Sequence, residues 1–125
     1  MTRLLWVFAA GGAGSVLRYA IALWSIDRFG TAFPYGTLIV NISGCFVIAV
    51  AMRLAAASSW PPDLQVAVTA GLLGGYTTYS AFNEQTIQLM QSGATGAAAI
   101  NVAATVVGGL AAGWLGVVVA RQLLA

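Results

Sequence analysis

Long apolar runs alternate with short polar segments along the whole chain. A helix that crosses the hydrocarbon core of a bilayer needs roughly 20 mostly apolar residues. Four runs reach this length, and segments rich in charge, proline or aromatic residues separate them. The pattern therefore predicts four membrane-spanning helices, at about residues 4–26, 35–57, 64–90 and 94–124.

Features at the ends of these runs support the same division. Trp6 and Trp24 lie about 27 Å apart along a helix, so they match the aromatic belts at the two faces of a bilayer. Pro62 and Asp63 are typical of the first turn of the third helix. Arg3 and the small residues at 9–11 also fit a cleaved signal peptide loosely, but the apolar run continues to Ile26, which favours an uncleaved first span.

The composition agrees with an integral membrane protein. Hydrophobic residues make up 60% of the 125 positions and charged residues only 6%, against about 45–50% and about 25% in soluble domains. No basic cluster is present, which excludes the usual footprint of nucleic-acid binding. We therefore expect residues 1–125 to form a single all-helical transmembrane domain.

The arginines are split almost evenly between the two ends of the predicted bundle. With four spans, Arg3, Arg53 and Arg121 share one side, Arg28 lies on the other, and Arg18 lies inside the first span toward Arg28. Lys and Arg near the spans decide orientation, and this bias is weak. The chain could therefore insert both ways up and pair with an inverted copy, or a small excess could fix one orientation.

The third run contains a poor helix interior. Gly74 and Gly75 are followed by Tyr76 and the β-branched pair Thr77 and Thr78, near the predicted bilayer midplane. We predict an interruption of the helix there, whose freed carbonyls could bind a cation and whose freed N–H groups could face an anion. The alternative is a kinked helix in which the threonine hydroxyls bond back to the preceding turn.

Donors suited to a small anion follow this interruption. Tyr79 and Phe82 share a helix face, and ring edges carry partial positive charge. Hydroxyl and amide groups lie on a neighbouring line, at Ser80, Asn83 and Thr86. Aromatic rings in membrane helices also serve simply as packing, so the residues alone leave both roles open.

Two further pairs of polar residues lie at depth. Thr37 and Asn41 are four residues apart, and Asn101 and Thr105 repeat that spacing in the fourth run. Amide and hydroxyl donors of this kind can serve an anion without a fixed charge. Interhelical hydrogen bonds are the alternative, fully adequate for Asn101 and plausible for Asn41.

Arg18 and Glu84 are the charges deep enough to matter. Arg18 could attract anions at a vestibule, or it could snorkel or cap a helix end. Glu84 could lie in a pore wall or near an interface. With no His, no Lys, no paired carboxylates and a single cysteine, Cys45, the chain has no catalytic constellation and no usual soft-metal site, so it is not expected to be an enzyme.

Four motifs together resemble the Fluc (CrcB) fluoride channel family. They are GGAGSVLRY at 11–19, GTLIVN at 36–41, GGYTTYSAF at 74–82, and Asn101 followed by Gly108. The resemblance covers all four spans in order. It implies an antiparallel, dual-topology homodimer in a bacterial plasma (inner) membrane, with two fluoride pores and a structural sodium ion where the broken third helices meet.

The resemblance also implies roles for single residues. The carbonyls of Gly74 and Thr77 from both subunits would ligate sodium. Asn41 would donate to fluoride, the edges of Tyr79 and Phe82 would contact the ion, and Ser80 would continue the polar track. The predicted fluoride path is completed by Thr37, by Gln85 and, toward the vestibule, by Arg18.

This chain departs from the family pattern at three positions. Tyr79 stands where the family usually has Phe, and Ala81 replaces a common hydroxyl residue. Gln85 occupies the usual position of a carboxylate, beside Glu84. These differences bear on selectivity and rate in the pore.

We therefore expect a passive channel that exports cytoplasmic fluoride. The alternative is a small multidrug-resistance-type, proton-coupled transporter. Such a transporter would need a membrane-embedded carboxylate in the first span to exchange protons for a cationic drug, and this chain has Arg18 there instead. A four-helix membrane scaffold is a third possibility, in which the polar residues only hold helices together.

Overall fold

The computed structural model describes all residues 1–125 and is entirely helical. Three helices, α1 (Thr2–Phe29), α2 (Tyr35–Ser58) and α6 (Thr95–Leu123), are long and apolar enough to cross a membrane. The remaining crossing is built from four shorter pieces: α3 (Pro62–Val66), the π-helical segment η1 (Ala67–Leu73), α4 (Gly74–Tyr76) and α5 (Tyr79–Gln91). The ends of these helices lie within three residues of the ends of the predicted runs.

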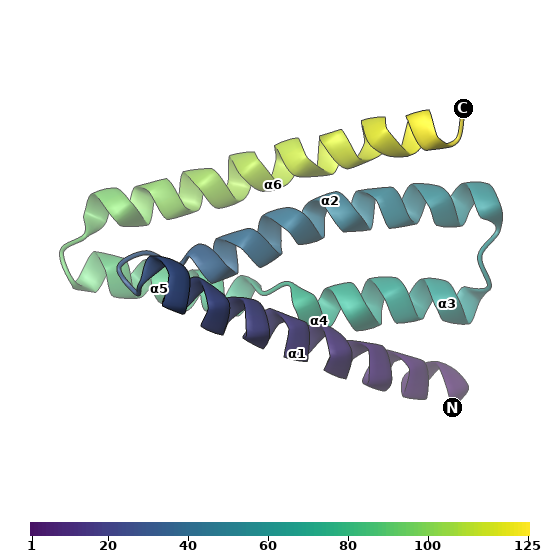
Figure 1. The fold of residues 1–125 in the computed structure, drawn as a ribbon, viewed down its shortest axis with the longest axis horizontal. Helices are drawn as coiled ribbons and strands as arrows, with labels where there is room; N and C mark the ends of the chain where they lie inside the picture. Colours follow the sequence, from purple (N-terminus) through teal and green to yellow (C-terminus); the bar gives the residue numbers. More distant parts are fainter.

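The helices form an elongated bundle in which α2 is central (Figure 1). It lies between α6 on one side and the interrupted third crossing on the other, and α1 packs across η1 and α4. Both termini lie at the same end as the connection between α2 and α3 (Figure 1). There Arg3 Nε donates to Asp63 Oδ1 at 2.7 Å, and Pro62 occupies the first turn of α3, as the sequence predicts.

Glycines bring α1 into direct contact with the third crossing. A Cβ at Gly14 would overlap the carbonyl oxygen of Leu72, and a Cβ at Gly75 would overlap that of Gly11. Gly71 meets Val7 and Ala10 in the same way. The small residues therefore let two helix backbones approach closely.

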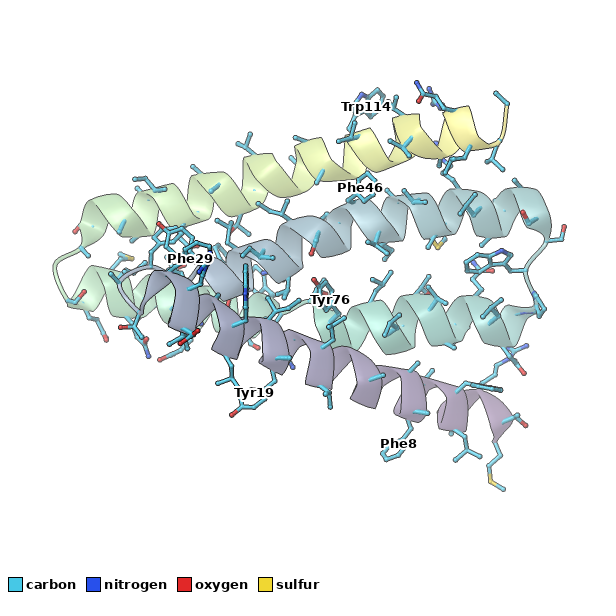
Figure 2. The ribbon with its side chains drawn as sticks, viewed as in Figure 1. Phe8, Tyr19, Phe29, Phe46, Tyr76 and Trp114 are labelled. Carbon is cyan, nitrogen blue, oxygen red and sulfur yellow. The ribbon has the colours of Figure 1, made fainter.

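The bundle buries little of itself. Only 16 of the 125 residues are buried, and most of these are small. Figure 2 shows Phe8 and Tyr19 pointing away from α1, and Trp114 pointing away from α6. These three side chains are 81%, 66% and 67% exposed. An apolar exterior of this extent fits a surface covered by lipid or by another subunit.

Candidate functional site

The third crossing is interrupted at two residues. Thr77 (φ −87°, ψ 160°) and Thr78 (φ −155°, ψ 116°) are extended, between the end of α4 and the start of α5. The predicted interruption is confirmed, but Gly74 and Gly75 are themselves helical. Gly75 packs closely against α1, where a Cβ would overlap the carbonyl oxygen of Gly11, and the two threonines carry the change of backbone direction.

Both threonine hydroxyls are used locally. Thr78 is the N-cap of α5, and its Oγ1 accepts the N–H of Ala81 at 3.2 Å. Thr77 Oγ1 donates back to the carbonyl of Leu73 at 3.0 Å. The back-bonded threonine that we considered as an alternative to a break is therefore present together with it.

Asn41, on α2, pairs with the backbone of the break. Its Oδ1 accepts the N–H of Thr78 at 2.8 Å, and its Nδ2 donates to the Thr78 carbonyl at 2.9 Å. The side-chain amide thus occupies both backbone groups of one extended residue. The amide nitrogen carries two hydrogens, so one N–H of Asn41 remains available.

Arg18, on α1, reaches the other side of the break. Its Nε donates to the carbonyl of Gly75 at 3.1 Å, in the last turn of α4. A cation is favourable at the C-terminal end of a helix, and the bond satisfies a carbonyl that has no helical partner. Arg18 therefore caps a helix end, which is the structural one of the two roles that the sequence left open for it.

Two carbonyl groups at the break have no hydrogen-bond partner. In an uninterrupted helix Gly74 O would accept the N–H of Thr78, but that N–H goes to Asn41. Neither Gly74 O nor Thr77 O accepts a hydrogen bond from the backbone or from a side chain. Both residues line the same hollow, of about 480 Å³.

The predicted fluoride-path residues line two hollows on either side of the break. The first, between α2, α6 and the third crossing, contains Asn41, Tyr79 and Phe82 as well as Gly74 and Thr77. The second, of about 240 Å³ beside α1, contains Arg18, Thr37 and Gln85. Thr78 lines both hollows. Ser80 lines neither of them, but its Oγ lies 3.2 Å from Thr78 Oγ1.

The two rings predicted to share a face do lie together. The centroids of Tyr79 and Phe82 are 5.7 Å apart, with the ring planes inclined at 57°. Phe82 is 9% exposed, whereas Tyr79 is 79% exposed in the single chain. The first ring after the break therefore stands open at the surface of the bundle.

Two of the remaining polar candidates, Asn101 and Glu84, line neither of the hollows at the break. Asn101 Nδ2 donates to Thr86 Oγ1 at 2.9 Å, so Asn101 makes the interhelical hydrogen bond that we considered for it. Glu84 is exposed and accepts from Gln88 at 2.8 Å. The buried oxygens Gln85 Oε1 and Thr105 Oγ1 have no partner, and both residues line hollows.

Comparison with known proteins adds a full-length similarity. The family model for CrcB-like protein, camphor resistance (CrcB), matches residues 5–117. A protein of Sorangium cellulosum is 43% identical over 126 aligned positions, covering 100% of this chain and 99% of its own length. One of Anaeromyxobacter dehalogenans is 44% identical, with 98% of both chains covered, and one of Acidobacterium capsulatum is 37% identical, with 98% and 99% covered. All three are named fluoride-specific ion channel FluC.

Proposed function

Since this chain belongs to the CrcB-like family, we propose that it is a fluoride-specific ion channel, a multi-pass membrane protein and not an enzyme. The observation that carries the proposal is the match over the full length to relatives named as such channels. The interrupted third crossing, with polar groups gathered around it, supports the same function.

We propose that fluoride passes along the two hollows and past Thr78. Fluoride holds its water tightly, so a selective path must replace that water with several donors without holding the ion too firmly. Arg18, Thr37 and Gln85 would receive the ion in the hollow beside α1. The free N–H of Asn41, the Ser80 hydroxyl, and the ring edges of Tyr79 and Phe82 would follow, giving passive export of cytoplasmic fluoride.

We propose that the working unit is an antiparallel dimer. In one chain Gly74 and Tyr79 are exposed, and the hollow that they line is open and largely apolar. A second copy in the opposite orientation would cover this face. The weak bias in arginine placement supports insertion both ways up. Such a dimer would carry two pores.

The carbonyls at the break fit a sodium ion. Gly74 O and Thr77 O are uncharged oxygens without hydrogen-bond partners, and they line one hollow. Freed carbonyls at broken membrane helices are typical sodium ligands. One chain supplies two such groups, and a pair of chains would supply four. Bound there, sodium would supply a fixed positive charge that holds the carbonyls of the two breaks together.

The placement of charge in α1 argues against a proton-coupled drug transporter. The carboxylate in α1 is Asp27, which is exposed near the end of the helix, and Arg18 is the charged residue farther inside. Glu84 is exposed on α5. The interior of α1 therefore carries an arginine and no acid at the depth where such a transporter would need its proton-exchanging carboxylate.

Fluoride efflux from liposomes tests the proposal. Purified wild-type protein should release fluoride. Asn41→Asp should lose efflux because a carboxylate replaces a donor, and Phe82→Ile should lose it because the ring edge is removed. Phe46→Ile is the matched control, since Phe46 lies along α2 toward α6 in a separate hollow. If Asn41→Asp and Phe82→Ile left efflux at the wild-type rate, the proposed path would be wrong. If wild-type protein released no fluoride beyond protein-free liposomes, the channel proposal itself would be wrong.

A further inference from the structure

The Asn41 side chain intercepts a backbone hydrogen bond that the third crossing would otherwise keep. In a continuous α-helix the N–H of Thr78 donates to the carbonyl of Gly74. Here it donates to Asn41 Oδ1 at 2.8 Å. The preceding bond of the same ladder, from Thr77 N to Leu73 O at 3.0 Å, is still made. The ladder therefore stops at the residue that Asn41 holds.

The second half of the pairing keeps Thr78 extended. Asn41 Nδ2 donates to the Thr78 carbonyl at 2.9 Å, so the amide binds the residue at both backbone groups. Close packing supports the contact, because a Cβ at Gly44, one turn along α2 from Asn41, would overlap Thr77 Cγ2. The helix α2 therefore contacts both threonines of the break, Thr78 through Asn41 and Thr77 through Gly44.

One consequence concerns the Gly74 carbonyl. With the Thr78 N–H engaged elsewhere, Gly74 O accepts no hydrogen bond, and it lines the same hollow as Thr77. If Asn41 had no acceptor, the Thr78 N–H would lose its partner, and Gly74 O would be the free acceptor four residues back. Buried N–H groups rarely remain unpaired, so re-forming that bond would be favourable.

We propose that Asn41 is a positioning residue for the cation site: by accepting the Thr78 N–H, it keeps the Gly74 carbonyl free to ligate sodium. The inference rests on the proposed sodium site and deepens it. The side-chain oxygen of Asn41 would serve the cation, and its remaining N–H is free to serve the anion. One residue of α2 thus couples the two ions.

A sodium titration of thermal stability tests this role without measuring transport. Wild-type protein and variants are purified in detergent and melted over a range of sodium concentrations, with N-methyl-D-glucamine holding the ionic strength constant. The quantity compared is the sodium concentration that gives half of the stabilisation. A residue that only supports folding changes the melting temperature at every sodium concentration and leaves this value unchanged.

Two substitutions at Asn41 separate its atoms. Asn41→Ala removes the acceptor, so the half-stabilising sodium concentration should rise about tenfold, the scale expected for competition by one hydrogen bond. Asn41→Asp keeps an oxygen for the Thr78 N–H, so its sodium response should persist while its fluoride efflux is lost. Asn101→Ala is the matched control, because that buried amide bonds Thr86 and not the break.

Each outcome bears on a different statement. Suppose that sodium stabilises both wild type and Asn41→Ala, with the same half-stabilising concentration. That result would overturn the positioning role of Asn41 and would leave the sodium site unaffected. No sodium response in wild type would overturn the sodium site and this inference together, while fluoride efflux would still report on the channel. If Asn41→Ala does not fold, Asn41→Asp decides, and loss of its sodium response would overturn the inference.

Discussion

At the scale of single residues, the side chain of Tyr79 is largely exposed on the surface of the single chain. It is 79% exposed, lies 5.7 Å from Phe82 between centroids, and carries a hydroxyl. Its ring edge, rather than its hydroxyl, is the feature that it shares with Phe82. The proposed path therefore depends on the aromatic ring at this position.

Substitutions at Tyr79 separate the ring from the hydroxyl. Tyr79→Phe keeps the ring edge, so fluoride efflux and the exclusion of chloride should persist. Tyr79→Ile should reduce efflux about tenfold, because ring contacts contribute about 0.5–1.5 kcal/mol. Both rates are read with a fluoride electrode on liposomes. Equal efflux from the two variants would show that the ring has no part in the path.

The sequence predicted this ring pair but not the partner of Asn41. A spacing of three residues places Tyr79 and Phe82 on one helix face whatever the tertiary fold. The contact between Asn41 and Thr78 joins residues 37 positions apart on different helices. Nothing local in the sequence indicates that the backbone of Thr78, rather than another side chain, receives the amide.

At the scale of elements, glycines set the distance between α1 and the third crossing. Gly14 and Gly12 lie two residues apart on the same helix but face different surroundings. A Cβ at Gly14 would overlap the backbone of Leu72, whereas one at Gly12 would have nothing within 4 Å. The pair therefore offers a matched comparison of packing and helix propensity.

Alanine at these two positions should have opposite effects on thermal stability. Gly14→Ala should lower the free energy of unfolding by about 1–3 kcal/mol or more, because backbone cannot move aside as a side chain can. Gly12→Ala should raise it by up to about 1 kcal/mol through helix propensity. Thermal unfolding in detergent measures both. Equal melting temperatures would contradict the close approach of α1 to Leu72.

The interruption of the third crossing was partly predictable. Gly74 to Thr78 form a poor helix interior, and the break lies at the end of that stretch. The break does not begin at the glycines, because both remain helical and Gly75 packs against α1. The π-helical segment at Ala67–Leu73 was not predicted, since its sequence mixes good helix formers with one valine, one threonine and one glycine and carries no signal specific to a π-helix.

At the scale of the whole molecule, a single chain buries little of itself and leaves one face open. Its core is small, and its break opens onto an exposed, largely apolar hollow. The same face carries Gly74, Tyr79 and the free carbonyls. An inverted second copy would complete both the hollow and the set of oxygens.

Insertion in both orientations can be measured with a single thiol. Thr31→Cys in a Cys45→Ala background places a cysteine in the exposed connection between α1 and α2. A membrane-impermeant reagent should label about half of the chains from outside, and the rest only after permeabilisation, because the arginine bias is weak. Labelling of all chains or none from outside would show one orientation and exclude the antiparallel dimer.

The most direct measurement of the central claim compares two anions in one preparation. Liposomes carrying the purified protein are loaded with potassium fluoride or potassium chloride, and valinomycin provides the potassium exit that electrically balances passive anion efflux. A fluoride-selective channel predicts rapid fluoride release that depends on both protein and valinomycin, with chloride retained. Equal release of the two anions, or no release of fluoride beyond protein-free liposomes, would contradict it.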